Sequence, residues 1–280
     1  MQTISGKVFL RDDQVLPAGS YDLSFYEQGP TLYEVFGFQD KRFFFFDDHL
    51  DRLAVSSSLA HLGIWMNRDA IMQTAMKVMT LNHAVTGSIN ISFIFSEPRH
   101  YTSHYIAPFR YDRAVREHGI TAGLLQAERF NPNIKFFNPD FRRTADKAIS
   151  DQNVTEVILV DGNGYITEGS RTNIFLIREN RITTTPVNRV LAGITRRHVI
   201  DICKQLGFTI VEKPVRLEYL TSFDGAFLTG TTSRVLPVRA IGDKMFEAGI
   251  HFGRRIREAY EERLKKATAY HEKMKNSGRE

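Results

Sequence analysis

Residues 166–177 read ITEGSRTNIFLI, and this stretch interrupts a strand pattern with a polar turn. Strand-forming residues flank a centre that contains a carboxylate, a glycine and a cation, at Glu168, Gly169 and Arg171. The pattern predicts two strands joined by a short turn, and therefore a fold that contains a sheet. A plain turn is one interpretation of the polar centre. The other is a functional site on a strand–turn–strand unit, because sites often lie on loops that a rigid scaffold positions.

Alternating patterns on both sides of this stretch predict an α+β protein. Asp161–Gly164, with the sequence DGNG, is a strong turn signal between apolar flanks. Helical spacing and strand-rich runs alternate along the chain, with helices predicted over 48–64, 67–82, 140–153 and 193–208 and strands over 7–10, 31–46, 88–95 and 156–185. We expect a small N-terminal α/β domain over residues 1–110, an interdomain linker over 111–125 and a larger C-terminal domain over 126–280. The C-terminal domain is expected to end in a charged helix.

The composition is that of a globular protein with a sizeable core. The chain has 280 residues, of which 42% are hydrophobic and 25% charged. Cys203 is the only cysteine, so no intrachain disulfide can form, which fits a reducing compartment. No apolar run reaches membrane-spanning length, and the first residues lack the pattern of a signal peptide. We therefore expect a cytoplasmic protein without a membrane partner.

The net charge of +5 raises the question of nucleic-acid binding. The basic residues are scattered, and the one dense run, residues 253–280, mixes acids and bases as a solvated helix does. No basic stripe alternates with aromatic residues, so we do not expect a nucleic-acid partner. A mildly basic protein suits small acidic substrates or a phosphorylated cofactor.

Three stretches could bind a phosphate group. Gly193, Ile194 and Thr195 lie where a helix is predicted to begin, and free N–H groups at such an end can bind an anion. A hydroxyl-rich turn, with Gly230, Thr231 and Thr232, follows an apolar strand. Arg52 lies on a predicted helix and could grip a phosphate. Each also has a plain structural interpretation, which is an ordinary helix cap, a common turn and a surface ion pair, respectively.

Lys135 is the candidate nucleophile. Its neighbours Ile134, Phe136 and Phe137 are apolar, and a desolvated lysine loses some of its preference for the charged form. A lysine in that state can form a Schiff base with a carbonyl compound. A lysine that only extends from a loop towards water is the plainer alternative.

Taken together in this order, the stretches HLDRL, IKFFN, GYITEGSRTNIF, LAGITR and FLTGTTSRVLPV resemble the fold-type IV pyridoxal-phosphate enzymes. That family includes branched-chain and D-amino acid aminotransferases, amine transaminases and aminodeoxychorismate lyase. The resemblance extends from about residue 20 to about residue 245. It implies the two-domain α+β fold, pyridoxal 5′-phosphate as cofactor, an amino acid and a 2-oxo acid as substrates, and a homodimer with each site near the subunit interface.

The resemblance also implies roles for individual residues. Lys135 corresponds to the Schiff-base lysine, and Glu168 corresponds to the partner of the cofactor's pyridine nitrogen. Asn173 corresponds to an asparagine beside the site, and the phosphate would be bound by Arg52, Ile194, Thr195, Thr231 and Thr232. Arg171 stands where many relatives have a small or acidic residue, so it could contact either the cofactor ring or the substrate. Lys147 is a rival for the lysine, but only Lys135 has the K-x-x-N pattern, with Asn138.

The preferred substrate stays open at this stage. The turn before Pro237 and Val238 is similar to that of the aminotransferase branches rather than the lyase branch. Tyr26 and Tyr33 are expected to line the substrate pocket. Arg99 follows a Glu-Pro pair, as in the D-amino acid branch, but the spacing of the nearby histidines, His100 and His104, departs from it, and without a third ligand they do not suggest a metal site. We expect a slight preference for branched-chain L-amino acids, with a D-amino acid aminotransferase, an aminodeoxychorismate lyase or a non-catalytic binding module as alternatives.

Overall fold

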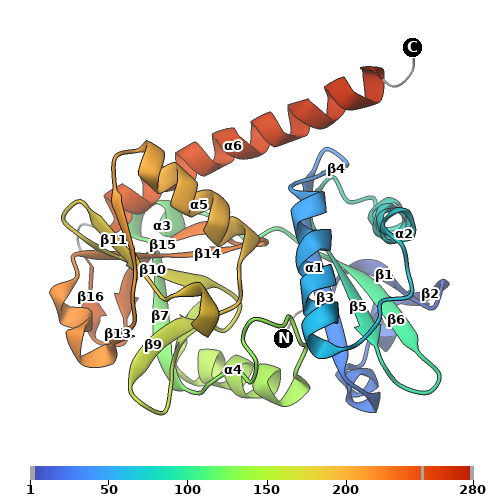
Figure 1. Cartoon of the computed structure of the whole chain (residues 1–280), viewed down its shortest axis with the longest axis horizontal. Helices are drawn as coiled ribbons and strands as arrows, with labels where there is room; N and C mark the ends of the chain where they lie inside the picture. The colour runs from blue at the N-terminus through green and yellow to red at the C-terminus, as the bar shows by residue number, and fades with distance from the viewer. Residues whose placement is uncertain (1–3, 247–248, 278–280) are drawn as a thin grey trace. The chain divides into compact units, whose positions relative to one another are not determined.

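The chain forms two compact units. The computed structural model describes residues 4–246 and 249–277 (Figure 1). Unit 1 comprises Met1–Phe109, Ile134–Phe141 and Leu264–Glu280, and unit 2 comprises Arg110–Asn133 and Arg142–Arg263. The first segment of unit 1 ends at Phe109, while Ile134–Phe141 and the residues from Leu264 onward group with unit 1 rather than with the C-terminal domain expected over 126–280. The expected linker over 111–125 differs from the structure, because this segment contains α3 (Arg113–His118) and most of β7 (Ile120–Gln126), and β7 pairs inside the sheet of unit 2.

Unit 1 is a six-stranded sheet with two helices on one face (Figure 1). The strands follow the order β2-β1-β6-β5-β3-β4, with bounds β1 (Ser5–Arg11), β2 (Gln14–Pro17), β3 (Thr31–Gln39), β4 (Arg42–Phe43), β5 (Thr86–Ile94) and β6 (His100–Ile106). The helices are α1 (Phe46–Ala60) and α2 (Arg68–Leu81), and two short 3-10 turns are η1 (Ala18–Ser20) and η2 (Leu23–Gln28). Every second residue of β3, from Leu32 to Phe38, points towards the helices, which is the two-residue period of a strand.

A tight turn divides the strand predicted over 31–46. Asp40 and Lys41 both have positive φ, at 50° and 61°, so β3 and β4 form a hairpin with a two-residue connection. Helix α1 then begins at Phe46. Its apolar side chains Leu50 and Leu53 are buried, as their helical spacing predicted.

Unit 2 contains a ten-stranded mixed sheet. Its strand order is β12-β11-β10-β14-β15-β7-β8-β9-β13, with β16 beside β15. Besides β7, the strands are β8 (Glu156–Val160), β9 (Tyr165–Gly169), β10 (Asn173–Arg178), β11 (Arg181–Thr184), β12 (Thr209–Glu212), β13 (Val215–Arg216), β14 (Gly225–Gly230), β15 (Arg234–Ile241) and β16 (Lys244–Met245). Its helices include α5 (Ile194–Gln205), most of α4 (Pro139–Asp151) and α6 (Gly249–Ser277) as far as Arg263, and its 3-10 turns are η3 (Val187–Arg189) and η4 (Leu217–Ser222). The rest of α6 groups with unit 1.

The turn between β9 and β10 forces this sheet to curl. Gly169 ends β9 and Asn173 begins β10, so the connection can span at most about 14 Å. In the sheet order, β14, β15, β7 and β8 lie between the two strands, which in a flat sheet would be roughly 24 Å. Residues 166–177 thus join two strands from opposite sides of a curved sheet, and they place their polar residues at that junction.

Most of the predicted elements are confirmed, including α1, α2, α4, α5 and the turn at Asp161–Gly164. The Asp161 carboxylate accepts hydrogen bonds from the backbone N–H groups of Asn163 and Tyr165, both at 2.9 Å, which explains the strength of that turn signal. Strand β6 was not predicted, since prolines and aromatic residues made its region look irregular. None of the helices in the described ranges is long and apolar enough to cross a bilayer.

Candidate active site

Lys135 lies on a short extended segment that adds to the open edge of β3 in unit 1. The backbone N–H of Tyr33 donates to the Lys135 carbonyl at 3.2 Å, and the N–H of Phe137 donates to the Thr31 carbonyl at 2.8 Å. From helix α1, the Ser56 hydroxyl accepts the backbone N–H of Lys135 at 3.1 Å. The main chain of Lys135 is therefore fixed from both a strand and a helix.

Aromatic rings surround the Lys135 side chain, which is 8% exposed. Its Nζ lies 4.4 Å from the centre of the Tyr33 ring, within the range of a cation–π contact. Phe137 packs against Tyr33 and Tyr26, with ring centres 5.8 Å and 4.7 Å apart. The structure thus brings the predicted lysine together with both predicted substrate tyrosines, whereas Lys147 is exposed and pairs with Asp151 at 2.7 Å.

Beside Lys135, unit 1 contains a buried carboxylate that the sequence did not point to. Glu34 on β3 is fully buried, and its Oε1 accepts the N–H of Val35 at 2.8 Å and lies 3.1 Å from His49 Nδ1. Arg52 donates to both carboxylate oxygens, from Nε at 2.9 Å and from Nη2 at 2.5 Å. Burial opposes ionisation, yet Arg52 and His49, with a smaller effect of Lys135, hold the pKa of Glu34 well below its usual range.

Arg52 is therefore not the surface residue of the plainer interpretation. It is 8% exposed and aligned by a bidentate contact, a geometry that fixes the guanidinium plane. Burial lowers the pKa of His49, and the attraction of Glu34 opposes that shift.

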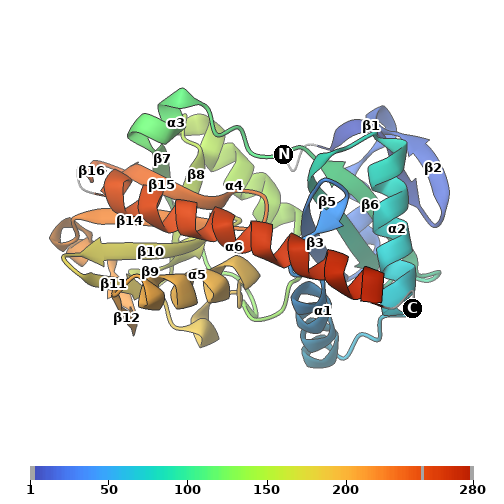
Figure 2. The ribbon, with the colours of Figure 1, turned by 90° about the horizontal axis from the view of Figure 1, so that it is seen from above.

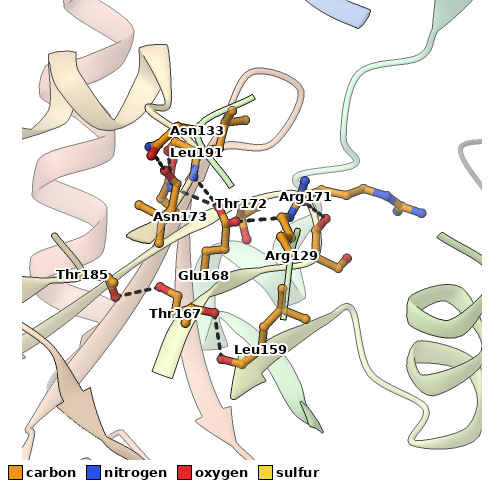
Figure 3. Close-up of polar contacts among 12 residues, drawn as sticks. Arg129, Asn133, Leu159, Thr167, Glu168, Arg171, Thr172, Asn173, Thr185 and Leu191 are labelled. Carbon is orange, nitrogen blue, oxygen red and sulfur yellow. Dashed lines mark hydrogen bonds and ion pairs between the residues drawn. The ribbon is translucent and has the colours of Figure 1, made fainter. Parts of the chain in front are cut away.

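Glu168 lies near the end of β9 in unit 2, with Asn173, Leu191 and Arg129 beside its carboxylate (Figure 3). Asn173 Nδ2 donates to Oε2 at 3.4 Å, and the N–H of Leu191 donates to the same oxygen at 3.3 Å. Arg129 Nε lies 3.1 Å from Oε1, an ion pair rather than an aligned hydrogen bond. Glu168 is 3% exposed, and these contacts orient its carboxylate.

A second buried carboxylate, that of Glu156, fixes the turn after Glu168. It accepts hydrogen bonds from the Ser170 hydroxyl at 2.6 Å and from the Arg171 N–H and the Thr172 hydroxyl, both at 3.2 Å. Gly169 is needed here, because an added Cβ would lie 2.1 Å from the Thr172 hydroxyl oxygen. The polar centre of the quoted stretch is thus a rigid turn.

The Arg171 side chain extends away from Glu168 and forms an ion pair with Asp146 on α4 (Figure 3). Its side chain is 39% exposed. In this arrangement Arg171 does not contact the Glu168 carboxylate, while Arg129, which the sequence did not single out, does.

The predicted phosphate residues of unit 2 lie on two turns. Helix α5 begins at Ile194, and no side chain in the described part of the chain caps it at Gly193. Gly193 approaches Asn173 so closely that an added Cβ would lie 2.1 Å from the Asn173 Oδ1, so the start of α5 is packed against the residue that orients Glu168. Thr195 is buried in the first turn of α5, and Thr231 and Thr232 are half-buried between β14 and β15.

The candidate residues around Arg99 do not form a cluster. Arg99 is exposed, with its guanidinium 5.9 Å from the Trp65 ring, and His100 pairs with Asp12 at 2.5 Å. His104 is buried separately on β6. Among the described residues, no group of three or more His, Cys, Asp or Glu side chains could hold a metal ion.

Glu34 and Arg129 are the residues that sequence reasoning missed. Glu34 interrupts a run of apolar residues in TLYEVFGF, and a charged residue on the inward face of a strand was the available signal. Arg129 had no comparable signal. Lys135, Tyr26, Tyr33 and Arg52 lie in unit 1, whereas the other predicted cofactor residues lie in unit 2.

Comparisons with known proteins agree on one family. Residues 31–241 match the amino-transferase class IV family. The D-alanine aminotransferase of Bacillus licheniformis is 25% identical over 236 residues, which cover 80% of this chain and 83% of that protein. The branched-chain-amino-acid aminotransferase of Pseudomonas aeruginosa is 37% identical over 94 residues, which cover 34% of this chain and 31% of that protein.

The fold has solved counterparts. The branched-chain amino acid aminotransferase of Escherichia coli has a TM-score of 0.77 at 19% identity, with 93% of this chain and 95% of that chain covered. At this identity the similarity supports the fold, while the family match extends over most of the chain. This chain belongs to the class IV aminotransferase family.

Proposed function

We propose that this aminotransferase uses pyridoxal 5′-phosphate, with Lys135 and Glu168 as its central residues, to move an amino group between an amino acid and a 2-oxo acid. The observation that carries the proposal is Lys135, whose main chain is anchored by Tyr33 and Ser56 and whose side chain is 8% exposed among aromatic rings. When bound, the cofactor supplies an electron-accepting ring that stabilises the charge left when the donor loses its α-proton.

The hydrogen-bond donors of the predicted phosphate-binding residues fit the phosphate of this cofactor. The start of α5 offers backbone N–H groups and the Thr195 hydroxyl, without a capping side chain in the described residues, and it has no acidic residue in its first turn. Such an end favours an anion such as a phosphate. Thr231 and Thr232 would add donors from the second turn, and Arg52 would add a guanidinium held in one orientation by Glu34.

Each remaining residue has a role that follows from its contacts. Glu168 would accept a hydrogen bond from the protonated pyridine nitrogen, and Asn173 would orient that carboxylate. Lys135 Nζ would take the α-proton of the donor and return it to the cofactor carbon that carried the lysine. Tyr26 and Tyr33 would line the substrate pocket. Arg171 would reach a substrate only if its ion pair with Asp146 broke.

For the substrate, we propose a slight preference for branched-chain L-amino acids. The relative with 37% identity is named a branched-chain-amino-acid aminotransferase. The expectation of a D-specific carboxylate site on Arg99 has weaker support, because Arg99 stacks on Trp65 and His100 pairs with Asp12. D-amino acid transamination stays the second candidate, since a D-alanine aminotransferase is 25% identical over most of the chain.

A homodimer is part of this proposal and rests on the family alone. A cytoplasmic location is proposed as well, because the chain has one cysteine, Cys203, which is buried and free. Sedimentation of the active protein tests the homodimer, and a fully active monomer would contradict it.

Two measurements test the chemistry. Borohydride treatment of the cofactor-loaded protein, followed by peptide mapping, should place the cofactor on Lys135, and a label on Lys147 would overturn the assignment. Lys147→Ala is the matched control, because Lys147 is exposed and pairs with Asp151 on its own helix. A panel of L- and D-amino acids with 2-oxoglutarate should show L-leucine ahead of D-alanine. Pyruvate released from aminodeoxychorismate without any transamination would favour the lyase.

A further inference from the structure

The first part of α6 lies alongside α5 in unit 2 (Figure 2). The mixed charges of residues 253–280 predicted a solvated helix, yet Ile256 and Tyr260 are almost fully buried. The Tyr260 hydroxyl donates to the Thr195 hydroxyl oxygen at 3.4 Å. A residue near the end of the chain therefore contacts a residue proposed to bind the cofactor phosphate.

The next residue of α6 contacts the other donor-rich turn. Glu261 forms an ion pair with Arg234, the residue that directly follows Thr231, Thr232 and Ser233. Arg234 has φ of 56°, the left-handed region that costs a non-glycine residue about 1 kcal/mol or more. The ion pair links α6 to the residue that ends this turn.

A third residue fixes α6 along the body of α5. Arg263 donates to the His198 carbonyl at 3.4 Å and to Gln205 Oε1 at 3.2 Å. Contacts from Tyr260, Glu261 and Arg263 thus set the position of α6 against α5 and the β14–β15 turn.

We propose that Tyr260 and Glu261 are positioning residues that hold the two phosphate-binding turns in register. The inference rests on the proposed function, because it assumes that Thr195 and Thr231 bind the cofactor phosphate. Thr195 accepts the bond from Tyr260, so its own hydroxyl hydrogen stays available for the phosphate. Burial raises the pKa of Tyr260 to about 12, so the phenol stays protonated at neutral pH and has a hydrogen to donate.

The test removes one oxygen atom. Tyr260→Phe keeps the buried ring and loses the hydroxyl. The matched control is Tyr105→Phe in unit 1, which loses a hydroxyl bonded to the Thr86 carbonyl at 2.9 Å. Equilibrium binding of pyridoxal 5′-phosphate and of pyridoxal, which lacks the phosphate, is followed by absorbance on the apoprotein. We expect Tyr260→Phe to weaken pyridoxal 5′-phosphate about two- to tenfold and to leave pyridoxal unchanged.

Glu261→Gln is the second variant and should weaken pyridoxal 5′-phosphate by a smaller factor, since its partner Arg234 is partly exposed. Equal weakening of both ligands by Tyr260→Phe, or no weakening, would overturn the inference while the function stands. If the parent protein binds neither ligand, the proposed function fails. In that case, thermal unfolding of the apoprotein with and without inorganic phosphate tests the inference. Phosphate should raise the unfolding midpoint less in Tyr260→Phe than in the parent and in Tyr105→Phe.

Discussion

Glu34 in unit 1 and Glu168 in unit 2 are both buried carboxylates on strands, but the protein holds them differently. Glu34 receives four contacts between 2.5 and 3.1 Å, two of them from the fork of Arg52. The contacts of Glu168 with Asn173, Leu191 and Arg129 are 3.1 to 3.4 Å long. The charge of Glu34 thus faces the Arg52 guanidinium through two short contacts, whereas the named contacts of Glu168 are longer.

This difference separates two tasks that a carboxylate can perform in one enzyme. A tightly paired carboxylate aligns another side chain, here the guanidinium of Arg52, and costs stability when its partner is removed. A carboxylate with long contacts keeps its orientation and can still accept a strong donor, such as a protonated ring nitrogen. Removing the charge of Glu34 should therefore lower the stability of the fold, whereas removing the charge of Glu168 should lower the reaction rate.

Removing the charge of Glu34 should have the largest effect on stability. Glu34→Gln leaves the buried Arg52 guanidinium without a compensating charge, which costs about 3–5 kcal/mol of unfolding free energy. Urea denaturation of the apoprotein measures this. Glu34→Leu combined with Arg52→Met removes both charges and should lose less than Glu34→Gln alone. A single variant as stable as the parent would show that the pair contributes little.

Removing the charge of Glu168 should slow the reaction instead. We expect Glu168→Gln to lower the rate of the half-reaction with an amino donor by roughly 10²–10³, the usual effect of losing one group that stabilises a developing charge. Its urea midpoint should change by less than that of Glu34→Gln, since the amide keeps most of the local contacts. Stopped-flow absorbance and denaturation of the same samples give both values. If Glu168→Gln unfolds as easily as Glu34→Gln, the contrast between the two carboxylates is wrong.

The sequence predicted the residues whose chemistry is local. Lys135 has apolar neighbours on both sides, and the start of α5 and the turn before Asn173 each lie within one short stretch. Glu34 could not be found this way, because it meets Arg52 only through the packing of β3 on α1, and they are 18 residues apart.

Tyr260 is separated from Thr195 by 65 residues, and the charged tail around it suggested solvent. Strand β6 was missed for a related reason. Prolines and aromatic residues made its region look irregular, and because Tyr101, Thr102, Ser103 and His104 are all buried, the stretch lacks the polar and apolar alternation of a half-exposed strand.

The smallest effect should come from a third kind of buried titratable group. His104 is 1% exposed, and neither of its ring nitrogens has a hydrogen-bond partner within the described ranges. Burial lowers its pKa to about 3. The unfolded chain takes up a proton near pH 6.5 while the folded chain does not, so His104 costs the fold stability as the pH falls from 7 towards 3. Between pH 7 and pH 5 the loss should be about 2 kcal/mol.

His104→Leu should remove that part of the pH dependence, whereas His118→Gln, which changes an exposed histidine on α3, should leave it intact. Urea midpoints at pH 7 and pH 5 for the parent and both variants isolate the contribution, because His49 and the carboxylates titrate alike in all three. An unchanged pH dependence in His104→Leu would mean that His104 has a partner in solution, such as an ordered water, that lets it hold its proton in the folded state. His104 would then resemble Glu168, whose side chain is held by long contacts, and not a buried group without a hydrogen-bond partner.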